Sequence, residues 1–594
     1  MIYLQTENFQ IDISRFGVSL SEESDLFTDS VNKNYSLPFV IEGDAELLAK
    51  LGLVHLENSS DVEIQIPCRL ILPDRHYKAN LFIGDIDGKK LECTITYGDE
   101  DLAVYDIELK NLPWPNIITD DLPMYAWSCS RKSWPSTAFN FPMVWKPSIA
   151  EEDNYEAFEG FINNYRDSSY VTNEIDNSGA EPKYLNKNVM VPMPYLLEIL
   201  RFIFAQEGKK IFGEVIDHPN LKRALYIPET FLEKFRGAEY QQWAFVDPIR
   251  QNIENNKAYS TYERILTPEV VGSYEIDYAI NLDPIQARYF SFTIFRQDAI
   301  TGEKTTLKKA TSEKNRVKLD QKFTVNIEDK DVFDKIVIEL ILEDQNQSIS
   351  DFNNFEYSFK GGRLNQFPNV FSLSNFVPDM TAGEYINLLK NWWNLDIDVQ
   401  ERYVVINFAQ DSVLERNVRD HSHLEDPDKK FTHNTNRFYK LSYANGETYF
   451  YNKRGRVFSD LVDEGTEEIT IELDVQPALV ELNQGIMTAV APEESSDIDF
   501  CLYDGQDENF QPTCSESISR SISLDEIGEK FWEKWLWFRI HSKTFKDSIE
   551  CSTSEIYDIK ELSFKYNEKQ VIKKISKKFQ SEKVMKVEVE SESF

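Results

Sequence analysis

One segment of this 594-residue chain, residues 371–408, constrains the fold more than any other. Thr381 can cap a helix, and Glu384, three residues later, can reach back to complete a capping box. Apolar side chains then recur at helical spacing until Asn394, where the pattern ends. Val404, Ile406 and Phe408 then alternate with Val405 and Asn407, which predicts a strand after a short turn. The segment therefore predicts a loop, a capped helix, a tight turn and a strand, and none of its side chains indicates catalysis.

Length and composition narrow the fold class. The chain is too long for one core and suggests roughly four domains. Its apolar fraction of 41% and aromatic fraction of 13% indicate folded, aromatic-rich domains rather than disorder. Thirty-nine Phe and 28 Tyr favour β-structure. We therefore expect a mainly β, multidomain protein with α+β parts, built from β-barrel or β-sandwich domains with one inserted antiparallel β-sandwich.

The charge and the cysteines exclude several functional classes. A formal net charge of −37 argues against nucleic-acid binding, because contacts to phosphate need Lys and Arg. It also disfavours stable membrane anchoring, and no uninterrupted apolar run reaches the length of a membrane-spanning helix. The acidic surplus either maintains solubility or forms a channel wall along which DNA slides. The start of the chain predicts no secretory signal, and six scattered Cys residues predict a reduced protein made in the cytoplasm.

The order of the expected elements divides the chain into six regions. These are an N-terminal α+β domain (1–115), an extended loop region (116–190), a helix-containing segment (191–255), a β-sandwich (256–365), a domain with the capped helix and strands (366–475), and a C-terminal β-rich domain (476–594).

The first region predicts a small α+β unit. Residues 2–13 alternate in polarity and predict one opening strand. Asp44 and Gly52 are expected at the two ends of a short helix, and Gly88 suits the turn of a hairpin. Three further strands are expected around Ile64, Phe82 and residues 93–96.

The pattern becomes regular again at Val191, after the expected loop region. Pro194 suits the first turn of a second helix, and Gly208 is expected to end it. A strand at 210–213 and a short element at 221–225 follow. The apolar face of this helix consists of Leu196, Leu197, Ile199, Leu200, Ile203 and Phe204.

The region that follows predicts an antiparallel sandwich. Five runs alternate in polarity, at residues 274–280, 290–294, 323–327, 336–342 and 355–359. A structural decoration and a glycan-binding module are both compatible with such a fold.

The last region contains two patterns that imitate binding sites. Trp532, Trp535 and Trp537 resemble a sugar-stacking platform, but their spacing in a helix-to-strand segment favours burial. The four lysines Lys573, Lys574, Lys577 and Lys578 alternate with apolar residues, which predicts a terminal hairpin with one solvated face rather than a nucleic-acid tail.

No sequence motif predicts an enzyme. The nucleotide-binding, zinc-protease and serine-hydrolase motifs GxxxxGK[ST], GxGxxG, HExxH and GxSxG are absent. One short segment is rich in metal-ligand types, but its polarity favours a solvated turn. That segment contains Asp420, His421, His423, Glu425, Asp426, Asp428 and His433. We therefore assign no catalytic, cofactor-binding or metal-binding residue.

The order of four separated segments resembles that of a known protein family. These segments are roughly 1–110, 190–235, 370–460 and 530–594. The sequence VPDMT before the capped helix, and the run Ile406-Asn407-Phe408 that ends the next strand, are similar to tail-hub proteins of phages and prophages of Bacteroidota. The pattern around Gly213-Glu214 at the end of the second helix-strand unit is similar too, as are the closing strands. The segment SLPFVIEG matches in part, because Leu37 stands where those proteins have an aromatic residue.

The resemblance implies a structural virion protein. It implies a ring of copies, with a trimer favoured, that joins the tail tube to a central spike or fibre and lets DNA pass. Expected partners are the tail tube or distal tail protein, the spike or fibre and the tape measure, at the tail tip or baseplate of a virion assembled in the host cytoplasm. Two alternatives stay open: a peripheral tail protein that binds host glycans through the sandwich, and a tail-associated hydrolase. A contractile injection machine is a third setting for a related fold.

Overall fold

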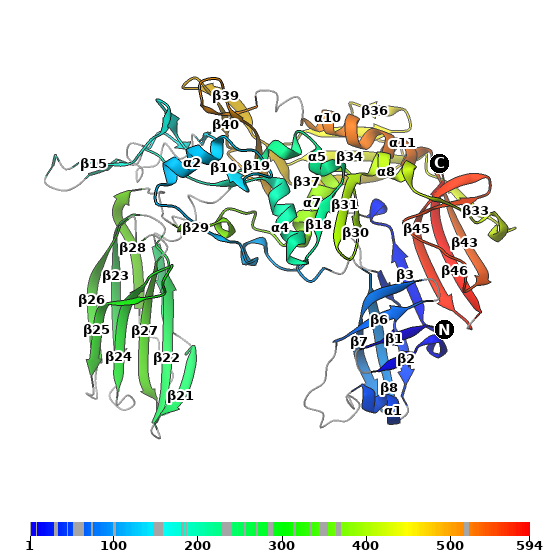
Figure 1. Ribbon diagram of the computed structural model, residues 1–594, viewed down its shortest axis with the longest axis horizontal. Helices are drawn as coiled ribbons and strands as arrows, with labels where there is room; N and C mark the ends of the chain where they lie inside the picture. The colour runs from blue at the N-terminus through cyan, green and yellow to red at the C-terminus, as the bar shows by residue number, and fades with distance from the viewer. Residues whose placement is uncertain are drawn as a thin grey trace.

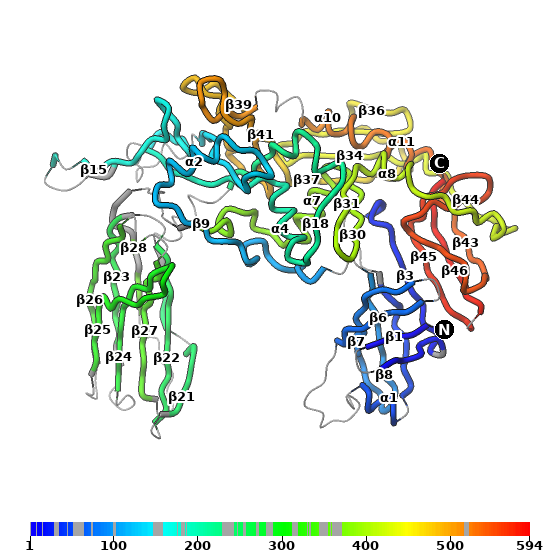
Figure 2. The backbone as a smooth tube through the Cα atoms, in the orientation of Figure 1, coloured from blue at the N-terminus to red at the C-terminus, as the bar shows by residue number. Residues whose placement is uncertain are grey.

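The chain folds into an arch (Figure 1). A body of helices and short sheets spans its top; a β-sandwich descends from one end and a sheet that contains both chain termini descends from the other (Figures 1 and 2). This computed structural model describes all residues except 1, 7–8, 29–33, 44, 52–64, 73–74, 99–101, 147–157, 177, 180–182, 186, 229–239, 246–247, 255–256, 269–270, 283–288, 313–316, 329–330, 332–333, 345–353, 364–369, 516–521, 582 and 594.

The two ends of the chain share one 14-stranded sheet. The joint is β3 paired antiparallel with β45, from Ser19↔Lys578 to Glu23↔Lys574. Along its main path the strands are β2 (Gln10–Asp12), β1 (Tyr3–Gln5), β6 (Gln65–Ile71), β7 (His76–Asp87), β8 (Lys90–Tyr97), β4 (Asn34–Ser36), β3 (Ser19–Glu23), β45 (Glu568–Phe579), β46 (Val584–Ser593), β43 (Lys543–Ser552) and β33 (Lys430–His433). Beside it, β5 (Phe39–Glu42) pairs with β8, β44 (Leu562–Lys565) with β45, and β32 (Val418–Asp420) with β44. The expected domains 1–115 and 476–594 are therefore continuous through this sheet.

The expected elements of the N-terminal region are found with one correction. The single strand expected at 2–13 is wrong: β1 and β2 form a hairpin, because the Thr6 N–H donates to the Phe9 carbonyl at 2.9 Å. Helix α1 (Ala45–Lys50) buries the two leucines Leu47 and Leu48. Gly88, with φ of 59°, occupies the turn between β7 and β8, as expected. The expected positions of Asp44, Gly52 and Ile64 lie outside the described residues.

The capped helix is confirmed as α7 (Ala382–Trp393). The Glu384 N–H donates to the Thr381 hydroxyl at 3.2 Å, and the Thr381 N–H donates to the Glu384 carboxylate at 2.7 Å. Asn394 ends the helix in the left-handed region, with φ of 50°. The strand β31 (Tyr403–Phe408) is confirmed, whereas the turn before it contains an unexpected strand, β30 (Leu395–Val399).

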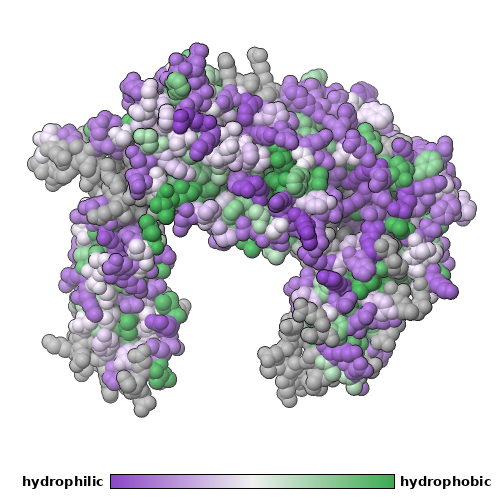
Figure 3. Space-filling model, viewed as in Figure 1, coloured by the Kyte–Doolittle hydropathy of each residue, from purple (hydrophilic) through white to green (hydrophobic). Residues whose placement is uncertain are grey.

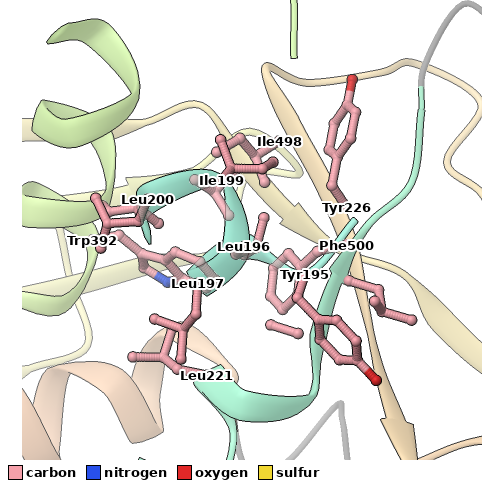
Figure 4. Close-up of a cluster of buried hydrophobic side chains, with 14 of the residues drawn as sticks. Tyr195, Leu196, Leu197, Ile199, Leu200, Leu221, Tyr226, Trp392, Ile498 and Phe500 are labelled. Atoms are coloured by element: carbon pink, nitrogen blue, oxygen red, sulfur yellow. The ribbon is translucent and has the colours of Figure 1, made fainter. Parts of the chain in front are cut away.

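The second expected helix is α4 (Leu196–Gln206), and it packs with α7 in the core of the body. Figure 4 shows α4 side chains clustered with Trp392, Ile498 and Phe500, the last two from β41 (Ile498–Gln506). Burial of each aliphatic side chain of this kind contributes about 1.5–3 kcal/mol. The helix leads through Gly208, with φ of 69°, to β18 (Lys210–Phe212). Residues 221–226 form a 3-10 turn (Leu221–Arg223) and β19 (Ala224–Tyr226).

Two expectations for residues 116–195 are wrong. Pro194 is not in the first turn of α4 but in β17 (Met193–Pro194), which pairs with β10 (Phe139–Asn140) before the helix begins. The expected loop region contains helix α2 (Leu122–Ser130), capped by the Asp121 carboxylate. It also contains short strands: β9 (Asn116–Ile118), β11 (Val144–Trp145), β12 (Phe161–Ile162), β13 (Tyr165–Arg166), β14 (Ser169–Tyr170), β15 (Glu174–Asp176) and β16 (Lys183–Leu185).

The inserted sandwich consists of two antiparallel sheets. One sheet contains β20 (Tyr240–Trp243), β28 (Asn354–Arg363), β23 (Val271–Leu282) and β26 (Val317–Ile327). The other contains β21 (Arg250–Glu254), β22 (Lys257–Leu266), β27 (Lys335–Asp344), β24 (Phe290–Gln297) and β25 (Lys304–Ser312). All five expected runs are strands, and the expected boundary at 256 falls between β21 and β22, so the sandwich extends back to Tyr240.

The rest of the body is built from short strands and helices. One sheet contains β36 (Gly455–Val457), β35 (Thr448–Asn452), β34 (Arg437–Tyr443) and β37 (Glu467–Leu473). Other strands are β29 (Val370–Ser372), β38 (Val475–Pro477), β39 (Leu479–Asn483), β40 (Ile486–Val490) and β42 (Pro512–Cys514), and other helices are α5 (Glu214–Asp217), α8 (Ala409–Glu415), α10 (Leu524–Ile527) and α11 (Glu533–His541).

The expected fold class is confirmed as mainly β and multidomain, with α+β parts and an inserted antiparallel sandwich. No sheet in the described part of the chain closes into a barrel, so that element of the expectation is not seen there. Among these residues no helix is long and apolar enough to cross a bilayer.

Candidate interaction surfaces

The segment rich in metal-ligand residues is a structural joint. Asp420 ends β32, His433 ends β33, and in the described part of the chain no group of three or more His, Cys, Asp or Glu residues is placed to hold a metal ion. His423 lies 3.3 Å from Glu555, and Glu425 accepts the Tyr566 N–H. These side chains therefore fasten the 420–433 segment to the C-terminal sheet.

His421 departs from the expected solvated turn, because it is buried. Its ring stacks on Tyr557, with centroids 4.2 Å apart. Nε2 lies 3.1 Å from the Ile556 carbonyl, which can only accept, so Nδ1 accepts from the Ser563 hydroxyl at 2.9 Å. Burial lowers the pKa of His421. The neutral ring is thus a packing element with both nitrogens hydrogen-bonded.

The three tryptophans near the C-terminus separate into two roles. Trp532 and Trp535 are buried, as expected, but Trp537 is 56% exposed and stacks on His541 with ring centroids 4.6 Å apart. Trp537 lines an apolar cavity of about 330 Å³ between α8 and α11 together with Leu414, which is also 56% exposed. The expected burial is therefore wrong for Trp537.

Three of the four lysines of the run have acidic partners. Lys577 lies 3.1 Å from Glu22, and both side chains are buried. Lys574 pairs with Glu23, and Lys573 lies 3.0 Å from Glu590. These pairs join β45 to β3 and β46, and the antiparallel pairing of β45 with β46 confirms the terminal hairpin.

A charged cavity lies where three regions of the chain meet. It has a volume of about 490 Å³ and is lined by residues 22–26, 75, 77, 396–400, 405, 407, 412, 415–416 and 558–560. Arg416 binds both oxygens of Asp396 at 3.0 Å, and Arg75 lies 2.9 Å from Asp558. The pKa of Asp558 is lowered: burial opposes this, but the Lys560 N–H and the Arg75 guanidinium outweigh it. An ionised, ion-paired carboxylate is a poor general acid.

Several apolar side chains stand out from the surface. Phe458 and Leu461 are 83% and 85% exposed, and Leu482 is 69% exposed. Figure 3 shows hydrophobic side chains interrupting the hydrophilic surface along the body. Such side chains are common singly, and only a contiguous apolar patch indicates a surface covered by a partner.

No protein-family model matches the chain, and no curated protein is similar to it. Solved structures overlap parts of it. One is the 43 kDa tail protein of prophage MuSo2 from Shewanella oneidensis, at 8% identity and a TM-score of 0.17, covering 56% of this chain and 97% of that one. Murine APRIL overlaps 20% of this chain and 97% of its own, at 10% identity and a TM-score of 0.15. A CBM4 structure overlaps 24% of this chain and 93% of its own, at 9% identity and a TM-score of 0.11.

These overlaps carry no argument about function, because their identities and TM-scores are too low. A prophage tail protein is among the solved structures that overlap the chain, and the roles of the surfaces above are argued from the residues alone.

Proposed function

We propose that this chain is a structural protein of a phage tail tip: a hub whose copies form a ring that joins the tail tube to a central spike or fibre and lets DNA pass. The proposal starts from the sequence resemblance, which rests on segments far apart in the chain. It gains support if those segments fold into one unit.

One contact carries the proposal. Gly213-Glu214 and Asn407 belong to two of the resembling segments, and the Glu214 N–H donates to the Asn407 side-chain oxygen at 3.0 Å. Their strands β18 and β31 pair in parallel, from Lys210↔Tyr403 to Phe212↔Val405. The Gly, the Glu backbone and the Asn of the two motifs therefore meet in one place, which gives a physical reason for their joint occurrence.

The remaining segments extend the same unit. The Tyr385 hydroxyl on α7 donates to the Leu196 carbonyl on α4 at 2.8 Å. The first and last resembling segments share the 14-stranded sheet through β3 and β45. The sandwich, for which the sequence shows no resemblance, forms a separate limb (Figure 1). Resembling segments that fold into one unit around an inserted domain are what a common scaffold with an insertion would produce.

The proposed role is mechanical rather than enzymatic. Three carboxylates of the charged cavity, those of Asp558, Asp396 and Asp398, are held by Arg75, Arg416 and Lys560 in turn. The exposed apolar side chains suit contacts with other subunits. Obligate interfaces of this type bury more than about 2,000 Å². The proposed partners are further copies of the chain, with a trimer favoured, and the neighbouring tail tube, spike and tape-measure proteins.

Electron microscopy of purified particles tests the proposal. We expect density for the chain at the tail tip, arranged as a ring around the tail axis, in particles labelled through a tag on the sandwich. Density elsewhere in the particle, or its absence from particles, would contradict the hub. Glycan-array binding by the full chain would favour the peripheral alternative, and zymography on host envelope material would reveal a hydrolase.

A further inference from the structure

A second cavity lies at the end of the body that carries the sandwich. It has a volume of about 510 Å³ and is formed by the end of α2, the turn before β19 and the loop between β41 and β42. Its lining is Ser130, Arg131, Lys132, Ser133, Tyr195, Lys222, Arg223, Tyr503, Asp504, Gly505, Gln506, Asp507 and Phe510. Four cations and two carboxylates is an unusual balance on a chain with a net charge of −37.

Only two of those cations lack an acidic partner. Lys222 pairs with Asp217 at 2.6 Å and Arg223 pairs with Asp504. Arg131 lies 4.2 Å above the Trp127 ring, and neither Arg131 nor Lys132 forms an ion pair with another described residue. The cavity, which we call the cationic pocket, is thus lined by a guanidinium and an ammonium that no described carboxylate pairs with.

The second carboxylate of the pocket is held by the chain itself. Asp507 accepts the N–H groups of Asn509 at 2.8 Å and Gln511 at 2.9 Å. It closes the loop between β41 and β42 instead of neutralising Arg131 and Lys132. The unpaired cations therefore remain available to an incoming anion.

An aromatic side chain is fixed at the edge of the pocket. Phe510 is 65% exposed although its φ is 63°, a conformation that bulky residues rarely adopt. The Tyr165 hydroxyl donates to the Phe510 carbonyl at 3.2 Å and helps to hold the turn. Strain of this kind persists only where the surroundings enforce it, and it is frequent at ligand clamps. The pocket therefore combines two cationic side chains, Arg131 and Lys132, with the exposed aromatic ring of Phe510, whose position the turn fixes.

The same chain carries a segment of complementary chemistry, which we call the acidic strap: residues 458–468, from the end of β36 into the first two residues of β37. It contains five carboxylates, and the sequence from 457 to 475 contains no Lys or Arg. Phe458 and Leu461 in the strap are the most exposed large apolar side chains in the described part of the chain. Asp460, Asp463 and Glu464 form no ion pair with other residues that the structure describes. The strap thus combines unpaired negative charge with unburied apolar surface.

The pocket and the strap lie at opposite ends of the body. Helix α2 and β19 are at the end with the sandwich, whereas β36 is at the end with the terminal sheet (Figure 1). They cannot meet within one molecule.

We propose that the acidic strap of one copy occupies the cationic pocket of the next, with carboxylates on Arg131 and Lys132 and an apolar strap residue against Phe510. A contact between two different patches on identical chains is head-to-tail, and it forms a closed ring when the rotation closes. Two chains of charge −37 repel each other, so association needs a local match of opposite charge. The inference rests on the proposed ring of copies and names the surfaces that hold it.

A charge-reversal set on the full chain tests the contact. The pocket variant is Arg131→Glu with Lys132→Glu, and the strap variant is Asp463→Lys with Glu464→Lys. A matched control, Lys308→Glu with Lys309→Glu, reverses two adjacent lysines on β25 of the sandwich. Analytical ultracentrifugation at low and high salt gives the self-association constant of each.

We expect each reversal to weaken self-association about tenfold or more, the combined pocket and strap variant to recover most of it, and the control to match the wild type. A milder pocket variant, Arg131→Gln with Lys132→Gln, is expected to lie between the two if reversal impairs folding. A wild-type chain that stays monomeric, or reversals that leave association unchanged, would overturn the contact.

A cross-link provides a second measurement. Lys132→Cys and Asp463→Cys, placed on separate copies and mixed, should give a disulfide-linked pair on oxidation, whereas either variant alone should not. A cross-link formed equally by either variant alone would contradict the head-to-tail geometry. If the cross-link does not form but microscopy places the chain at the tail tip, the hub uses another interface between copies. If the cross-link forms but the chain is not at the tail tip, the ring of copies serves elsewhere.

Discussion

Two glycines at the ends of β18 provide a stringent test of how the body is held together. Gly208 and Gly213 both have positive φ, 69° and 114°. A Cβ on Gly208 would meet nothing within 4 Å, whereas a Cβ on Gly213 would lie 2.2 Å from the Ile406 carbonyl oxygen and 2.7 Å from the Asn407 side-chain oxygen. Alanine at the two positions therefore separates backbone strain from loss of the β18–β31 joint.

The expected magnitudes differ by several-fold. Left-handed strain costs about 1–2 kcal/mol, partly offset by the lower entropy of the unfolded chain, so Gly208→Ala should cost about 1 kcal/mol. Gly213→Ala adds overlap with backbone, about 1–3 kcal/mol, and the hydrogen bond from Glu214 to Asn407, about 1 kcal/mol. The total for Gly213→Ala is about 3–5 kcal/mol.

Hydrogen exchange on the full chain is the suitable assay, because a multidomain protein has no single unfolding free energy. We expect amides of β18 and β31 to exchange about 100-fold faster or more in Gly213→Ala and only several-fold faster in Gly208→Ala. Amides of the sandwich should not change in either variant. Equal effects of the two substitutions, or unchanged protection of β31 in Gly213→Ala, would refute the proposed joint.

Three further predictions concern single interactions. Thr381→Ala should lower the local stability of α7 by about 1 kcal/mol, measured by hydrogen exchange of its first turn, because the capping hydroxyl is lost. Lys565→Met should lower the local stability of the C-terminal sheet by about 3–5 kcal/mol, measured by hydrogen exchange of β43 and β44, because the Asp547 carboxylate would remain buried without its ion-pair partner; adding Asp547→Leu should restore much of this stability. Burial lowers the pKa of His218 to about 4 from 6.5, so the unfolded state protonates first on acidification. The contribution of neutral His218 to folding stability should therefore be complete above about pH 6.5 and decrease as the pH drops toward 4. His218→Phe should flatten this pH dependence, measured by thermal unfolding at a series of pH values.

Local signals in the sequence predicted local structure well. The capping box of α7, the end of α4 at Gly208 and the alternating strands of the sandwich depend on residues that are neighbours in the sequence. Helix α2 was missed because its sequence, LPMYAWSCS, lies among Pro, Trp and Ser residues and has no clear apolar stripe. Strand β25 was missed because it is a polar edge strand with few apolar residues.

Long-range pairing was not predictable from these patterns. Glu23 and Lys574 join β3 to β45 across 551 positions, and no local feature of either strand specifies the other. The cationic pocket was missed for the same reason, since Arg131 and Phe510 come together only in the folded body. An adjacent Arg and Lys in a strongly acidic chain was the one available signal, and it is weak without the fold.

The ion pairs that other Lys and Arg residues form show why an adjacent Arg and Lys without acidic partners is informative. The chain has 64 Lys and Arg residues against 101 Asp and Glu residues. Several of them join sequence-distant regions: Arg75 to Asp558, Lys560 to Asp398 and Lys577 to Glu22.

Because acids are in excess, a cation at such a position finds a carboxylate within its own chain. Arg131 and Lys132 are adjacent and lie in a cavity, yet they have no such partner in the described structure. If they served solubility only, reversing their charge would make the acidic chain no less soluble and would leave its association unchanged. If they join copies, the same reversal must weaken the ring and a reversal of the strap must restore it.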